Sequence, residues 1–302
     1  MKIGYPCINR SIGCRGDKTF RLKSYSEERL VKTVEENLFC LSEMLKFNLK
    51  HNILFFRITS DLVPFASHPI CKFNWQEHFK KGFIRIGNFV KVHGIRISMH
   101  PDQFTLINSV DRNILKASLR ELRYHCQVLD LMSLDASAKI QIHVGGVYGD
   151  KDKSIKRFLR RFTRLDKCVT KRLVIENDDR NYSLSDCLLI HQEIGVPVIF
   201  DLFHHQLNSS GETVKHSVEK STRTWRRSDG FPMVDYSCQE AGERKGRHAE
   251  SINPRHFKKF LEETKPFDYD VMLEIKDKEK SALRAVNAAW GDGRFVRTRQ
   301  SR

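Results

Sequence analysis

The chain has 302 residues, of which 40% are hydrophobic and 30% are charged, so it can bury a sizeable core and is not disordered by composition. No stretch is apolar and long enough to cross a bilayer, and residues 1–10 contain no apolar signal region. We therefore expect a cytoplasmic protein, nucleoid-associated if prokaryotic. The formal charge of +16 and isoelectric point near 9.6 favour a polyanionic partner over a small neutral metabolite.

Eight apolar runs with strand character alternate along the chain with amphipathic stretches of helical length. The strand-like runs cover residues 2–5, 53–58, 95–99, 139–142, 172–175, 197–200, 232–236 and 270–273. The helical patterns cover residues 26–47, 74–92, 110–131, 152–167, 184–193, 212–225 and 253–263, and Ser24 or Ser26 is positioned to cap the first. The regular βαβα order predicts an α/β protein with a parallel sheet, and eight strands close it into a single (β/α)8 TIM barrel.

A doubly wound open sheet is the competing architecture, but it usually has a glycine-rich phosphate turn after the first strand. Here the first strand leads into Tyr5-Pro6-Cys7-Ile8-Asn9, so the barrel is favoured. We expect a catalytic barrel domain over residues 1–280. Residues 281–302 are expected to form a basic C-terminal extension that is partly disordered.

Cysteines and basic clusters complete the description of the chain. The eight cysteines are scattered without a C-x-x-C pair, so we expect reduced thiols. Lys and Arg cluster at residues 156–164, 223–227, 244–247 and 294–302. One such cluster can be a solvated helix face, but their number favours contact with a polyanion.

Metal-binding side chains follow the strand-like runs at the point where each run ends. His100, His143, Glu176, Asp201 and Glu274 each lie at or just past such an end. A TIM barrel builds its active site at this C-terminal rim of the strands. Each residue alone is also compatible with a satisfied core position, but a carboxylate that closes a buried strand is costly without a cation.

Three further residues extend the predicted metal centre. Asp201 and His204 have a D-x-x-H spacing that directs two ligands at neighbouring ions, Asp235 lies within the seventh strand-like run, and His248 follows it. Imidazole and carboxylate ligands from several strands predict a cluster of two or three divalent ions, the arrangement used in two-metal hydrolysis. The three carboxylates Glu176, Asp201 and Glu274 are the predicted catalytic residues.

Several segments together resemble the UV damage endonuclease family, in its order, from Gly4 to Glu279: GYPCIN, FFRITSDLVPFASHP, RISMHPDQF, HVGGVYGDK, LVIENDD, FDLFHHQLN, VDYSCQ, GRHAE and VMLEIKDKE. The resemblance implies a TIM barrel related to endonuclease IV that holds divalent ions, most often Mn²⁺, with Mg²⁺, Zn²⁺ or Co²⁺ as alternatives. It also implies incision of lesion-carrying double-stranded DNA immediately 5′ to a UV photoproduct. The products would be a 3′-hydroxyl and a 5′-phosphate. Separately, nothing in the sequence suggests an obligate dimer, so we expect a monomer with no membrane and no obligate protein partner.

The resemblance also assigns residues by position. The family's metal ligands fall on His100, His143, Glu176, Asp201, His204, His248 and Glu274. Some members have Lys-x-His on the seventh strand where this chain has Met233-Val234-Asp235, so a carboxylated lysine is impossible and Asp235 remains as an oxygen ligand. The lesion-probing pair reads Gln103-Phe104 instead of Gln-Tyr, which keeps an aromatic wedge. Further DNA-contacting positions fall on Tyr5, Asn9, Arg57, His68, Tyr148 and Lys151, with Ser60 beside them.

Three other functions remain open from the sequence. A sugar isomerase or epimerase uses a similar ligand set in the same fold, but the charge of +16 and the Gln103-Phe104 pair argue against a small neutral substrate. An endonuclease for apurinic sites would share the metals and differ in the lesion-probing loops. A DNA-binding module without catalysis would leave Glu176, Asp201 and Glu274 to repel one another without a cation.

Overall fold

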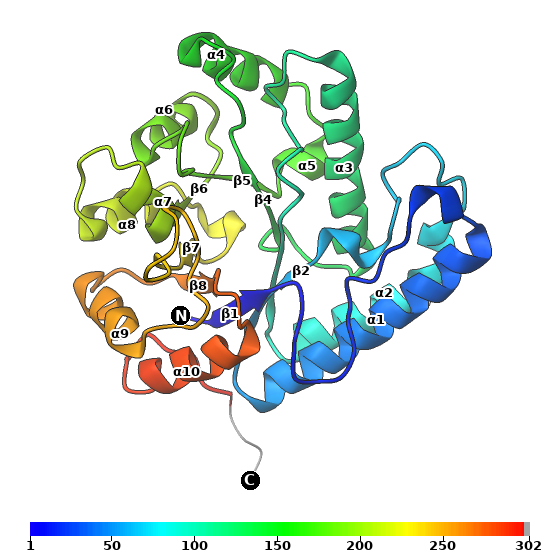
Figure 1. Ribbon diagram of the computed structural model, residues 1–302, viewed down its shortest axis with the longest axis horizontal. Helices are drawn as coiled ribbons and strands as arrows, with labels where there is room; N and C mark the ends of the chain where they lie inside the picture. The colour runs from blue at the N-terminus through cyan, green and yellow to red at the C-terminus, as the bar shows by residue number, and fades with distance from the viewer. Residues whose placement is uncertain (299–302) are drawn as a thin grey trace.

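Eight parallel strands form a closed barrel in sequence order, β1 to β8, in the computed structural model, which describes residues 1–298 (Figure 1). The strands are β1 (Ile3–Pro6), β2 (Phe55–Ile58), β3 (Arg96–Met99), β4 (Lys139–His143), β5 (Leu173–Glu176), β6 (Val198–Asp201), β7 (Met233–Tyr236) and β8 (Asp270–Leu273). Each strand pairs with the next, and β1 pairs with β8. The predicted (β/α)8 barrel is confirmed.

Helices from the segments that connect the strands surround the barrel on its outside (Figure 1). They are α1 (Glu27–Lys50), α2 (Trp75–Val92), α3 (Arg112–Leu131), α4 (Lys151–Phe162), α5 (Lys167–Thr170), α6 (Leu184–Ile194), α7 (Leu202–Leu207), α8 (Val214–Thr222), α9 (Pro254–Glu263) and α10 (Glu279–Ala289). Three short 3-10 helices, Leu22–Ser24, Ser60–Leu62 and Arg227–Asp229, lie in the connections. Ser26 caps α1, since its hydroxyl accepts a hydrogen bond from the Arg29 amide.

Two short helices depart from the prediction. The helix expected over residues 152–167 ends at Phe162, and α5 follows as a separate turn. The segment after β6 forms α7, which is capped by the Asp201 side chain at the His204 amide, 2.6 Å away. Both helices are shorter than the window over which helical periodicity is recognisable in a sequence.

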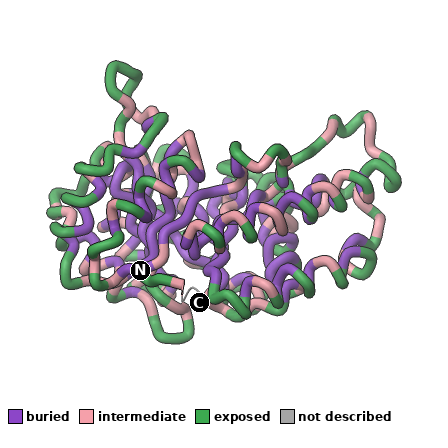
Figure 2. The backbone as a smooth tube through the Cα atoms, turned by 90° about the horizontal axis from the view of Figure 1, so that it is seen from below, coloured by how far each residue is buried: buried purple, intermediate pink, exposed green. Residues whose placement is uncertain are grey.

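The interior of the barrel is layered because alternate residues of a strand point to the same side. Phe55, Val174, Ile199, Met233 and Met272 form an apolar layer inside the barrel, separate from the larger core between strands and helices. Two residues further along the same strands, and therefore one layer closer to the C-terminal rim, lie Arg57, Glu176, Asp201, Asp235 and Glu274. Figure 2 shows the buried residues concentrated in this central part of the molecule.

The opposite, N-terminal end of the barrel is closed by buried ion pairs. Arg96 at the start of β3 pairs with Asp270 at the start of β8, with Nη1 and Oδ2 2.8 Å apart. Lys139 at the start of β4 pairs with Asp229, with Nζ and Oδ1 2.6 Å apart. We call these two pairs the barrel floor.

The C-terminal segment differs from the expected extension. Helix α10 buries Ala282, Ala285 and Val286, and the amide of Val296 donates to the Met1 carbonyl at 2.9 Å. The boundary expected at residue 280 thus falls inside the last helix of the barrel, because the apolar face of α10 covers β1 and α9. The part of the predicted disorder on residues 299–302 lies outside the described residues.

A disulfide joins Cys14 to Cys40, which contradicts the prediction that all thiols are reduced. The pairing arises because the loop after β1 folds back along α1 and brings the two Cα atoms to 5.8 Å, a separation that the sequence spacing of 26 residues does not reveal. Among residues 1–298, the helices are all too short or too polar to span a membrane.

Candidate metal centre

The predicted ligands converge at the C-terminal rim because the barrel closes. His143 at the end of β4 is in register with Glu176 at the end of β5, and Asp201 on β6 is in register with Asp235 on β7. Glu274 directly follows β8. Residues separated by more than a hundred positions in the chain therefore share one mouth, as the sequence predicted.

Ligand atoms gather there into three overlapping groups, in each of which one atom per residue lies within 4.8 Å of the others. The groups are His100, His143 and Glu176; Glu176, Asp201 and His204; and Asp201, Asp235 and Glu274. Glu176 belongs to the first two groups and Asp201 to the last two. Shared carboxylates of this kind bridge neighbouring ions in multinuclear sites.

Glu176 is the central residue of the cluster and is 1% exposed. Its Oε2 lies 3.6 Å from Nε2 of His100 and 3.9 Å from Nε2 of His143. Its Oε1 lies 3.0 Å from Nδ1 of His204, yet accepts no aligned hydrogen bond. Oδ2 of Asp201 is likewise buried without a partner among the described residues. Buried, unpaired carboxylate oxygens are costly, and a divalent cation between them would satisfy both.

Two histidines are oriented by main-chain carbonyls. Nδ1 of His100 is 2.7 Å from the Pro101 carbonyl oxygen, and Nδ1 of His248 is 3.0 Å from that of Glu274. A ring nitrogen that donates to a carbonyl leaves Nε2 as the unprotonated ligand atom, which is the usual outer-sphere arrangement in metal sites. His248 is outside the three groups, but its ring centre lies 6.1 Å from that of His204.

The protonation equilibria reflect excess buried negative charge. Burial by itself would lower the pKa of His204, but the carboxylates of Asp201 and Glu176 outweigh burial and raise it to about 11. Burial raises the pKa of Asp201 well above its ordinary value, with further increases from nearby carboxylates. The site therefore attracts positive charge, whether protons or metal ions, and the residues present fit a metal cluster.

Arg57 and Gln141 lie beneath the ligands and connect them. The guanidinium of Arg57 donates to Asp235 at 2.8 Å and to Glu274, and it also donates to Oε1 of Gln141 at 2.7 Å. The amide of Gln141 donates to Asp235 at 2.6 Å and to Glu176. Gln141 was missed in the sequence, although its alternation with His143 on one strand was a signal that both point inward.

Several predicted DNA contacts lie elsewhere than expected. Arg57 is 3% exposed and belongs to the barrel interior, so it is not placed to bind a DNA phosphate. Tyr5 is fully buried, with its hydroxyl 2.7 Å from Oδ1 of Asn48, and Asn9 is buried against that hydroxyl. Lys151 pairs with Asp186 at 2.9 Å. Position in a rim segment does not determine side-chain direction: Arg57, Tyr5 and Asn9 point into the protein, whereas Lys151 is exposed but paired with Asp186.

The remaining predicted contacts are accessible. Phe104 is 75% exposed, and Gln103 and His68 are exposed as well. Tyr148 is 40% exposed beneath the Arg157 guanidinium, which lies 5.3 Å from the ring centre. The exposed residues Arg244 and Lys245 occupy the loop that leads into His248. This basic loop and Phe104 therefore flank the ligand cluster.

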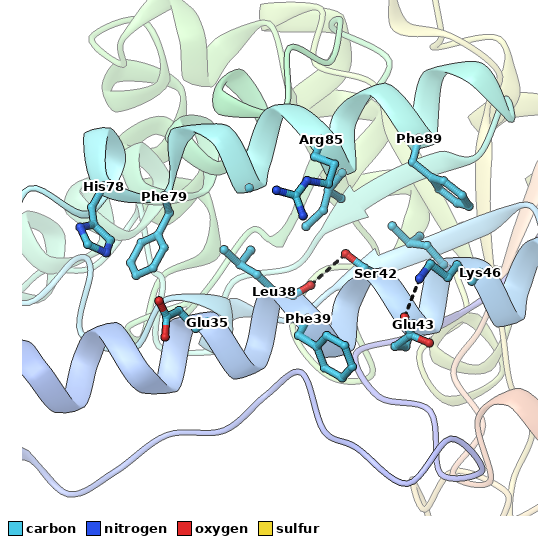
Figure 3. A pocket seen from close by; sticks show the side chains of 13 residues that line it. Glu35, Leu38, Phe39, Ser42, Glu43, Lys46, His78, Phe79, Arg85 and Phe89 are labelled. Atoms are coloured by element: carbon cyan, nitrogen blue, oxygen red, sulfur yellow. Dashed lines mark hydrogen bonds and ion pairs between the residues drawn. The ribbon is translucent and has the colours of Figure 1, made fainter.

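Two surface hollows have similar volumes but differ in the residues that line them. One, of about 640 Å³, lies between α1 and α2, where Phe39 and Phe79 line it and the polar groups of Ser42 and Lys46 bond within α1 (Figure 3). The other, of about 620 Å³, lies at the rim and is lined by His100, Gln103, Phe104, His248, Glu274 and Lys278. Of these two, the rim hollow is the one that joins candidate ligands to the exposed residues Gln103 and Phe104, which the sequence predicts to probe the lesion.

The fold and this ligand cluster define a TIM barrel equipped to hold metal ions at its C-terminal rim. Comparison with known proteins identifies the family: the model described as UV-endonuclease UvdE matches residues 1–291, so the chain belongs to that family and is an endonuclease. The crystal structure of SacUVDE has a TM-score of 0.92 and 46% identity, covering 96% of this chain and 98% of that one.

Curated relatives agree with this assignment. The UV DNA damage endonuclease of Clostridium perfringens (strain 13 / Type A) is 40% identical over 290 residues, which is 95% of this chain and 70% of the relative. That of Bacillus cereus (strain G9842) is 31% identical over 297 residues, with 95% and 94% covered. Endonuclease IV from Thermus thermophilus has a TM-score of 0.52 and 12% identity, covering 82% of this chain and 92% of that one, which shows the fold alone.

Proposed function

We propose that this chain uses divalent metal ions to hydrolyse the DNA phosphodiester immediately 5′ to UV photoproducts, both cyclobutane dimers and 6-4 photoproducts, leaving a 3′-hydroxyl and a 5′-phosphate. The observation that carries the proposal is that a buried carboxylate oxygen of Glu176 and one of Asp201 accept no hydrogen bond from the described residues, at the rim of a UV-endonuclease barrel. The proposed setting is cytoplasmic, and the proposed form is a monomer acting on double-stranded DNA.

The ligand set would be His100, His143, Glu176, Asp201, His204, His248 and Glu274. By resemblance to the family the ions would be Mn²⁺, with Mg²⁺, Zn²⁺ or Co²⁺ as alternatives, and the carboxylates are ligands that suit Mn²⁺. Bound there, such ions supply a water of lowered pKa and stabilise negative charge on the scissile phosphate. No covalent nucleophile from the protein is required.

The chain's own residues set the geometry of this chemistry. The Glu176 carboxylate lies close to the imidazoles of three histidines, and the side-chain amide of Gln141 fixes its position by donating a hydrogen bond to it. Because Glu176 and Asp201 are almost fully buried, bulk water does not weaken their electrostatic interactions. Glu176, Asp201 and Glu274 are therefore the proposed catalytic residues.

Lesion recognition would use Gln103 and Phe104 from the loop after β3. A photodimer stacks poorly and deforms cheaply, so an exposed aromatic side chain can enter the duplex at the lesion. The basic loop with Arg244 and Lys245 would hold phosphates without reading the sequence. Binding should therefore weaken steeply as the salt concentration rises.

The test is incision of a duplex that carries one defined photodimer, with Mn²⁺ or with chelator, beside a matched abasic duplex and an undamaged one. We expect a metal-dependent nick 5′ to the dimer. Cutting of the abasic duplex alone would assign the chain to the apurinic-site class instead. Inertness towards all three duplexes would refute the proposal, and sugar turnover in that case would favour the isomerase or epimerase alternative.

A further inference from the structure

The third ligand group already contains a cation supplied by the protein. Asp235 accepts from Nη2 of Arg57 at both carboxylate oxygens, at 3.0 and 2.8 Å, and Glu274 accepts from Nη1 through Oε1. Oδ2 of Asp235 also accepts from the Gln141 amide at 2.6 Å. The lone pairs of Asp235 are therefore used within the protein.

The other two groups are different. Oε1 of Glu176, Oδ2 of Asp201 and Nδ1 of His143 are buried, and none has a hydrogen-bond partner among the described residues. A divalent ion there would displace no hydrogen bond made by these three atoms, although Nδ1 of His204 lies 3.0 Å from Oε1 of Glu176. An ion in the third group would have to displace Arg57, which is 3% exposed on β2 and would then be a buried charge without a partner.

From this contrast we infer that the centre holds two divalent ions, one in each of the first two groups, and that the Arg57 guanidinium occupies the place of a third. Arg57 is then a positioning residue, which fixes Glu274 and carries one permanent positive charge beneath the ions. The inference rests on the metal centre proposed above and deepens it.

The charges of the site agree with this count. Glu176, Asp201, Asp235 and Glu274 contribute four carboxylates and Arg57 one guanidinium, which leaves three negative charges when the histidines are neutral. Two divalent ions exceed that by one positive charge, whereas three would exceed it by three. Excess positive charge of that size in a buried site is unfavourable before the phosphate arrives.

The experiment counts ions in the full-length chain without DNA, by native mass spectrometry after saturation with Mn²⁺. We expect two ions in the wild type and two in Asp235→Asn, because the amide preserves the shape of a residue that ligates no metal. The matched control Asp201→Asn should lose at least one ion. Three ions in the wild type, or the loss of one in Asp235→Asn, would overturn the inference.

Arg57 itself gives the complementary test. Arg57→Met vacates the third group, so saturation should reveal one additional ion, while Arg57→Lys keeps a cation there and should remain at two. A count that stays at two in a folded Arg57→Met would contradict the assignment of Arg57 to an ion position. If Arg57→Met does not fold, Asp235→Asn decides. Absence of any bound ion in the wild type would instead refute the proposed metal centre, which separates the two failures.

Discussion

Both ends of the barrel contain buried charged side chains, but these side chains have different partners at the two ends. On the barrel floor each buried cation meets a carboxylate, Arg96 with Asp270 and Lys139 with Asp229. At the rim, Glu176 and Asp201 retain buried oxygens without partners among the described residues. The floor cations are neutralised within the protein, although Nε and Nη2 of Arg96 also lack a hydrogen-bond partner, whereas the rim oxygens retain acceptor capacity for a ligand. The same residue types therefore indicate structure at one end and chemistry at the other.

The largest effect should come from removing charge at the rim. In Glu176→Gln we expect incision of a photodimer duplex to fall by roughly a thousandfold or more, because the carboxylate shared by two ligand groups is lost. The control Glu43→Gln, an exposed carboxylate on α1, should keep full activity. Equal activity of the two variants would contradict a catalytic role for Glu176.

Removing charge on the floor should instead cost stability. Arg96→Met leaves Asp270 buried without its cation, so we expect the free energy of unfolding to fall by about 3–5 kcal/mol, measured by chemical denaturation. The number of bound Mn²⁺ ions should not change. Adding Asp270→Asn should restore part of the loss, because both charges are then absent. An unchanged midpoint in Arg96→Met would show that the floor pair contributes nothing.

Acid should act on a buried histidine behind the rim. Burial lowers the pKa of His125 to about 4, below the value near 6.5 of an unfolded chain, so the unfolded state binds more protons between these values. Stability should thus fall as the pH drops from 6.5 towards 4, by up to about 3 kcal/mol from this residue. Denaturation with chelator present should show a shallower acid loss in His125→Gln. Parallel pH profiles for the two proteins would contradict this.

The smallest effect on incision should come from replacing the exposed aromatic residue Phe104. Phe104→Ala should lower kcat/KM on the photodimer duplex by roughly tenfold, the size expected from losing one stacked aromatic ring. Stability and ion count should stay the same because Phe104 is 75% exposed. Phe39→Ala, at an exposed phenylalanine on α1, is the matched control and should cut normally. If Phe39→Ala impaired incision as strongly, the loss could not be assigned to lesion probing.

The sequence by itself determined the barrel and which imidazole and carboxylate residues lie together at its rim. Alternation of strand and helix patterns is local, and it predicts eight parallel strands whose C-terminal ends meet. His143, Glu176 and Asp201 therefore could be placed together from their positions at strand ends. The predicted helix boundaries agree with the structure within a few residues for α2, α3, α6 and α9.

Only the tertiary structure decided which partners these residues have. Closure of the barrel brings Arg57 from β2 against Asp235 from β7. The Tyr5 hydroxyl meets Asn48 on α1, and the loop after β1 sets Cys14 beside Cys40 on the same helix. Such pairings depend on side-chain direction and on neighbours far away in the chain. The local periodicity of the sequence carries no information about either. Residue type and strand position were enough to find the candidate ligands, but only the assembled barrel shows that the Arg57 guanidinium lies among them.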